Sequence, residues 1–153
     1  MEQIILPMSM NILRGREDAE TLMNEILPFA KRMLKKFGGF HPYGGYMKYD
    51  GKIVEVGVDT APEEMPAGKD LFSILQKSFQ ELAGENKCKA TAIVFDVQIP
   101  MSGIDSKTDA VQISLDHSDG YSADVFLPYE KKGAGITFGK VFSQQGHQRI
   151  FLK

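Results

Sequence analysis

Two neighbouring stretches, TAIVFDVQIP (residues 91–100) and DAVQISLDHSDGYSADVFLPY (residues 109–129), carry the densest strand pattern in the chain. In the second stretch, apolar or aromatic side chains alternate with polar ones, as expected for two strands that each bury one face. The apolar positions are Val111, Ile113, Leu115, Tyr121, Ala123, Val125 and Leu127. The two stretches therefore predict the centre of an antiparallel sheet.

The turn that ends in Gly120 decides how the last two of these strands pair. A two-residue loop would place apolar side chains opposite polar ones and so mix the two faces. A three-residue loop, with Gly120 in the left-handed conformation, pairs Leu115 with Ala123 and keeps one face apolar. We therefore predict the three-residue loop, which also places His117 on the core face opposite Tyr121.

Two segments repeat apolar residues at spacings of three and four and so predict amphipathic helices, at residues 16–37 and 70–83. The first begins with acidic residues, ends with basic ones and is followed by Gly38-Gly39, as the helix dipole and a glycine stop favour. Pro28 lies inside its pattern, so we expect a kink or a break there.

The remaining segments predict further strands. Residues 43–58 predict a hairpin that aligns Met47 with Val54 across a two-residue Asp50-Gly51 turn. Residues 136–142 suggest a long strand interrupted by glycine, and residues 149–152 a short one. Residues 4–7 fit a short strand or a segment that packs on the core, and residues 61–68 form a linker rich in turn formers.

These elements predict one α+β domain over residues 1–153, in the order α-β-β-α-β-β-β-β. We expect a single antiparallel sheet of about five strands, with two helices packed mainly on one face. The order resembles that of roadblock and longin-type modules and, more loosely, that of profilin-like folds. The resemblance lies in the order of the elements alone, so it implies no function and no site residue.

Composition narrows the class of protein. The chain has 153 residues, of which 42% are apolar and 25% charged, with a net charge of −2 and one cysteine, Cys88. Its positive charge is not concentrated as nucleic-acid binding requires, so we expect no nucleic-acid partner. The first residues lack the basic start of a signal peptide, and no apolar run is long enough to span a bilayer. We expect a cytoplasmic protein with no membrane partner.

The loop FHPYGGY (residues 40–46) is one candidate for a binding site. It combines His41, Tyr43 and Tyr46, and aromatic loop residues on a rigid scaffold can line a ligand site. The alternative is a loop whose glycines only provide unusual backbone angles.

The second group of candidates lies on the central strands. His117 would be a buried histidine bonded to a backbone carbonyl, or else a general base oriented by a carboxylate. Asp96 is a candidate because its strand could be covered on both sides, and a buried carboxylate needs partners. In contrast, Asp116 and Asp124 belong to the polar face and are expected to be solvated. Tyr121, opposite His117, completes the candidate ligand-binding residues.

The spacing of the histidines and a basic segment at the end of the first predicted helix give two further expectations. The three histidines lack metal-ligand spacing and Cys88 stands alone, so we expect no metal and no cofactor. The sequence KRMLKK (residues 31–36) would be either a patch for phosphate or an acidic partner, or a solvated helix face near a negative helix end.

No specific activity follows from these residues. The absence of a catalytic constellation favours a small non-enzymatic binding or interaction module, of immunity or adaptor type. Its partner would be another protein or a second copy, because exposed sheet edges invite strand pairing. The alternative is a small-ligand-binding protein or weak hydrolase with a site between residues 40–46 and the sheet. That site would use His41 or His117 with Asp96.

Overall fold

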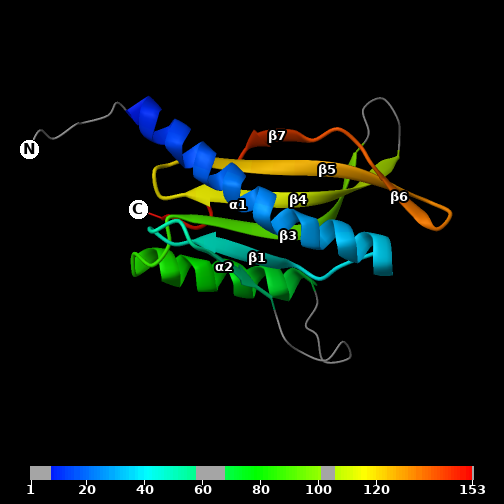
Figure 1. The fold of residues 1–153 in the computed structure, drawn as a ribbon, viewed down its shortest axis with the longest axis horizontal. Coiled ribbons are helices and arrows are strands. Elements are labelled where there is room, and N and C mark those ends of the chain that lie inside the picture. The colour runs from blue at the N-terminus through cyan, green and yellow to red at the C-terminus, as the bar shows by residue number, and fades with distance from the viewer. Residues whose placement is uncertain (1–7, 58–67, 101–105, 153) are drawn as a thin grey trace, which may run out of the picture.

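The computed structural model describes residues 8–57, 68–100 and 106–152. Two helices and one antiparallel sheet of seven strands make up this part of the chain (Figure 1). The helices are α1 (Met8–Phe37) and α2 (Gly68–Gly84), and the strands are β1 (Tyr43–Met47), β2 (Ile53–Val56), β3 (Ala90–Pro100), β4 (Lys107–His117), β5 (Ser122–Lys132), β6 (Gly135–Phe138) and β7 (Phe142–Gln145). The predicted segment at residues 4–7 and nearly all of the predicted linker lie outside the described residues.

The strand order is β2-β1-β3-β4-β5-β6, and β7 pairs with β5 on the same side as β6. The α+β class is confirmed. The sheet has more strands than the five or so expected, because the chain after β5 forms two short strands instead of one long one. Gly139 joins them, with its N–H donating to the Pro128 carbonyl at 2.8 Å.

The predicted register of the central hairpin is confirmed. Leu115 pairs with Ala123, and the His117 N–H donates to the Tyr121 carbonyl at 2.9 Å. Gly120 has a φ of 104°, a conformation that only glycine adopts without strain. The three-residue loop therefore follows from burial of the apolar face of β4 and β5, because a shift of one residue in their pairing would expose that face.

The predicted two-residue turn of the first hairpin is wrong. Met47 pairs with Ile53 rather than Val54, which leaves a three-residue loop that ends in Gly51 at a φ of 92°. The Lys52 N–H donates to Asp50 Oδ1 at 3.0 Å, a local bond that favours this longer turn. The strand pattern could not select the register here, because no residue of β2 is fully buried.

Helix α1 is longer than predicted and is not broken at Pro28. It begins at Met8, so its first turn carries no acidic residue, contrary to the expectation. The Tyr43 hydroxyl donates to the Ile26 carbonyl at 2.6 Å and accepts from the Ala30 N–H at 3.1 Å. In a regular helix the Ala30 N–H would donate to the Ile26 carbonyl, and Pro28 lies between these two residues. The Tyr43 hydroxyl bonds to both groups and so supports the helix where the proline weakens it. No helix in the described ranges is both long and apolar enough to cross a membrane.

The two helices cover opposite faces of the sheet, and the expectation that they share one face is wrong. Helix α1 crosses in front of the strands in Figure 1 and buries a cluster that includes Val94 and Ile113. Helix α2 buries Leu75 and Phe79 against Ile93 on the other side. This arrangement is possible because β3 is buried on both faces from Ala90 to Val94.

The last described residues, 146–152, form a segment that we call the C-terminal strap. It crosses the α2 side of the sheet and contains no strand, unlike the prediction for residues 149–152. Ile150 is buried with Leu75 and Phe79, the Gln80 side chain donates to the Arg149 carbonyl at 2.7 Å, and the Gln148 N–H donates to Ser122 Oγ at 3.0 Å. The strap covers sheet residues that α2 does not reach.

Candidate functional site

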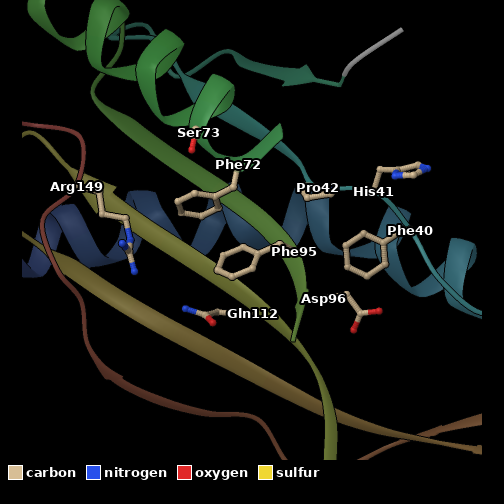
Figure 2. Close-up of a pocket in the computed structure, with 9 residues that line it drawn as sticks. All are labelled: Phe40, His41, Pro42, Phe72, Ser73, Phe95, Asp96, Gln112 and Arg149. Atoms are coloured by element: carbon tan, nitrogen blue, oxygen red, sulfur yellow. The ribbon is translucent and has the colours of Figure 1, made fainter. Parts of the chain in front are cut away.

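A cleft of about 550 Å³ opens on the α2 side of the sheet, where the loop before β1 meets α2 and the strap (Figure 2). Its volume lies within the range of small-molecule sites. The residues that line it come from the loop before β1, from α2, from β3 and β4 and from the strap: Phe40, His41, Pro42, Phe72, Ser73, Phe95, Asp96, Gln112 and Arg149. The cleft lies between residues 40–42 and the sheet, because the rest of the predicted 40–46 loop is strand β1.

Aromatic rings form the apolar part of the cleft. Phe72 of α2 and Phe95 of β3 meet edge to face, with ring centroids 4.8 Å apart at an interplanar angle of 73°. Phe40 lies on the other side of the cleft and packs edge to face on Tyr43 at 5.9 Å. Rings held from three different elements give the cleft rigid apolar walls.

Two polar side chains in the cleft have hydrogen-bonding capacity left over. The Arg149 guanidinium lies 5.5 Å from the Phe72 ring centroid, and its Nε is buried without a hydrogen-bond partner. The Gln112 amide forms no hydrogen bond with any other residue that the structure describes. Figure 2 shows both extending into the same part of the cleft. A buried donor without an acceptor costs about 1–3 kcal/mol, so this end of the cleft favours an acceptor from outside the chain.

Asp96 lies at the opposite end of the cleft and is exposed, because the double covering of β3 ends at Val94. The Tyr129 hydroxyl donates to Asp96 Oδ1 at 2.7 Å. Partial desolvation raises the pKa of Asp96, although this hydrogen bond opposes the rise. Because Asp96 follows Phe95 on β3, its carboxylate points to the opposite face of the sheet, toward Tyr129 in the cluster under α1, and not toward Arg149.

Of the three candidates from residues 40–46, only His41 lies in a loop, because Tyr43 and Tyr46 belong to β1. His41 lines the cleft but is exposed, and its ring turns away from Phe95 in Figure 2. Tyr43 is buried against α1 through its hydroxyl. Tyr46 packs on Phe79 at a centroid distance of 6.1 Å, within the cluster under α2. Only His41 of these three reaches the cleft.

His117 and Tyr121 lie at the other end of the sheet. His117 pairs with Ala90, whereas Asp96 pairs with Val111, and these positions are about 20 Å apart at roughly 3.4 Å per residue. His117 and Asp96 are therefore not brought together. Tyr121 instead lines a second cleft, which also has a volume of about 550 Å³, between α1 and β7.

His117 is buried, with both of its ring nitrogens engaged. Its Nε2 lies 2.8 Å from Asp18 Oδ2, and its Nδ1 accepts the Asp119 N–H at 2.9 Å. Of the two partners considered for His117, a backbone carbonyl or a carboxylate, the structure has the carboxylate. Because Nδ1 accepts, the proton of the neutral ring is on Nε2 and is donated to Asp18, which Lys89 also contacts at 3.3 Å. Neither nitrogen has a free lone pair with which to act as a general base.

The expectation that Asp116 and Asp124 are solvated is wrong. Their exposed fractions are 3% and 1%, because the strap covers them. Asp116 Oδ1 accepts from Ser122 Oγ at 2.8 Å, and Asp124 Oδ2 lies 3.0 Å from His147 Nδ1, while Asp124 Oδ1 is buried without a partner. Desolvation and, to a lesser extent, the charge of Asp124 raise the pKa of Asp116 to about 6. No local pattern signals this burial. The one hint is the apolar pair Ile150-Phe151 in the strap.

Other chemistry is limited in the described ranges. No group of three or more His, Cys, Asp or Glu side chains there is placed to hold a metal ion. The Cys88 thiol is buried, which raises its pKa to about 11 and keeps it protonated and unreactive. No protein family, curated protein or solved structure matches the chain. The geometry of the clefts is therefore the basis for any functional inference.

Proposed function

We propose that this protein is a non-enzymatic binding module that holds a small molecule in the cleft at Phe95. The ligand would have a flat apolar body, to lie against Phe72 and Phe95, and a hydrogen-bond acceptor that faces Arg149. The buried Arg149 Nε without a partner carries this proposal, because an acceptor on a ligand would satisfy it. The single buried thiol, Cys88, is compatible with a reducing, cytoplasmic setting.

The second large cleft supports binding less well. Its two charged residues, Arg16 and Glu20, form an ion pair with each other at 2.8 Å, so neither charge needs a partner from a ligand. A hydrolytic role for the first cleft also lacks support. His117 is held by Asp18 at the far end of the sheet, and His41 forms no hydrogen bond with Asp96, whose Oδ1 accepts from Tyr129. The aromatic rings and the Arg149 guanidinium that line the first cleft are suited to binding a ligand and include no catalytic pair.

A matched set of aromatic probes tests the proposal by NMR. Benzamide and benzoate carry an acceptor on a flat ring, whereas benzylammonium carries only donors. We expect the first two to shift the Arg149 Nε–H and Gln112 side-chain amide resonances in a saturable way, and benzylammonium to leave the Arg149 resonance unchanged. If no probe shifts these resonances, or if benzylammonium shifts the Arg149 resonance as strongly as the others, the proposal is wrong.

Two arginine-to-lysine variants, one in each cleft, test whether the probes bind at Arg149. Arg149→Lys keeps the positive charge but removes the planar guanidinium and its Nε–H. We expect it to weaken benzamide binding about tenfold, which corresponds to about 1.4 kcal/mol. Arg16→Lys makes the same change in the second cleft and should leave benzamide binding unaltered. Equal losses in both variants would mean that the probes bind elsewhere.

A second candidate function is self-association or binding of a protein partner through β7. All four residues of this strand are exposed, and its outer edge pairs with no other described strand. Such an edge can accept a strand from another chain. Light scattering over a range of concentrations would show a dimer that Gln144→Lys weakens, since a lysine at an edge opposes strand pairing. A monomer at all concentrations would leave a different protein as the only partner for this edge.

A further inference from the structure

One end of the molecule gathers basic side chains from two elements that are far apart in the sequence. Helix α1 ends there, and so does the hairpin between β5 and β6, as Figure 1 shows. Lys31 and Lys35 lie 5.4 and 5.8 Å from the ring centroid of Phe138 in β6. Lys131 Nζ lies 3.7 Å from the position that a Cβ atom on Gly38 would occupy. We call the following set the basic tip: Lys31, Arg32, Lys35, Lys36, Lys131 and Lys132.

Most of these side chains form no ion pair, although the charge of Lys131 acts on Asp96. Lys132 pairs with Glu130 at 3.4 Å. None of the other five cations forms an ion pair with a residue in the described ranges. Outside the basic tip, Arg16, Lys87 and Lys89 have carboxylate partners, whereas Lys48, Lys77 and Lys140 form no ion pair with a described residue, so the tip differs in how many such cations it gathers. A protein with a net charge of −2 thus keeps a local excess of positive charge at one end.

The negative end of the α1 dipole accounts for only part of this excess. Lys35 and Lys36 are in the last turn, where a cation stabilises the helix. Lys31 and Arg32 lie a turn earlier, beyond the short range of that effect, and Lys131 comes from a different element. The basic tip therefore has more charge than the helix end requires.

An exposed aromatic ring lies among these charges. The Phe37 side chain at the end of α1 is 68% exposed, and Lys36 Nζ lies 5.3 Å from its ring centroid. An exposed apolar ring beside a basic surface is typical of segments that rest on anionic membranes, where the ring enters the headgroup boundary and the cations meet the phosphates. Neither of the two large clefts is lined by a residue of the basic tip.

We propose that the basic tip docks this protein on the surface of an anionic lipid bilayer, with the Phe37 ring at the headgroup boundary. Contact of this kind does not require a helix that spans the bilayer. The exposed Phe37 ring favours a bilayer over nucleic acid, because the headgroup boundary of a bilayer accepts an apolar side chain. The proposal is independent of the ligand cleft and would survive its failure.

Sedimentation of the full chain with lipid vesicles tests this inference. We expect binding to vesicles that contain phosphatidylserine, weakened by added salt, and no binding to vesicles of phosphatidylcholine alone. Lys35→Gln/Lys36→Gln should weaken binding about 25-fold, at about fivefold per charge, and Lys131→Gln, from the other element, about fivefold. Phe37→Ser should also weaken binding to phosphatidylserine vesicles relative to the wild type, although it leaves the charge of the protein unchanged.

The matched control is Lys48→Gln/Lys77→Gln, which removes two exposed lysines outside the basic tip and should bind like the wild type. Thermal melts establish that each variant is folded. Equal binding to both kinds of vesicle, or equal losses in the control and tip variants, would overturn the proposal. Tighter binding to a single-stranded oligonucleotide or to polyglutamate than to phosphatidylserine vesicles would also overturn it and would assign the surface to that partner class.

Discussion

Replacement of Asp116 by asparagine gives the sharpest test of how the strap and the sheet fit together. Burial raises the pKa of this carboxyl from 3.8 to about 6, so the folded protein holds the proton more tightly than the unfolded chain does. The stabilising contribution of Asp116 is therefore fully present below pH 3.8 and is lost as the pH rises through about 6. Asparagine cannot ionise and removes this dependence.

The size of the effect follows from the two pKa values. Their difference corresponds to about 3 kcal/mol, at about 1.4 kcal/mol per pKa unit. An amide changes the hydrogen bonds with Ser122 and the strap by a constant amount at every pH. Because a small part of this effect is already present at pH 4, the free energy of unfolding of Asp116→Asn relative to the wild type should rise by about 2.5 kcal/mol between about pH 4 and about pH 8, whatever its value at pH 4.

Urea unfolding of both proteins across this pH range measures the difference, provided that the slopes with denaturant stay equal. Glu25→Gln removes an exposed carboxylate from α1 and controls for the change in net charge. If the difference between Asp116→Asn and the wild type stays constant with pH, or falls as the pH rises, then Asp116 is not held in a desolvated site and the covering by the strap is refuted.

Three further substitutions test separate contacts by the same unfolding assay. Tyr43→Phe removes the hydroxyl that bonds two backbone groups of α1 and should destabilise the fold by about 1–3 kcal/mol; no loss would show that the helix does not need it. Asp18→Ala leaves the buried ring of His117 without its acceptor and should cost a similar amount, about 1–3 kcal/mol, which Asp18→Asn should partly restore. Gly44→Ala places a Cβ in collision with the Ala92 carbonyl oxygen and should prevent stable folding, whereas Gly57→Ala meets nothing within 4 Å and should be tolerated; equal stability of the two would contradict the close packing of β1 on β3.

The sequence could predict the features that depend on local patterns. The alternation around Gly120 was enough for the register of the central hairpin, because only one pairing keeps its apolar residues on one face. The same reasoning failed at Asp50-Gly51. Strand β2 is only partly buried, so a shift of one residue in its pairing with β1 would expose no fully buried side chain. The position of a cleft near residues 40–46 was expected, but Phe72, Gln112 and Arg149 were not, because they approach from three other elements.

The class of fold, the two helices and the central register could be predicted because they depend on periodicity and on turn residues near one another in the chain. Which polar residues are buried depends on segments that meet only in the folded protein. Asp116 and Asp124 have the pattern of a solvated face, and the strap that covers them begins more than 20 residues after Asp124. Likewise, the charges of Lys35 and Lys131 form one surface only because α1 and the β5–β6 hairpin end at the same side of the sheet. Burial and electrostatic potential depend on distances through space, which the order of residues does not contain.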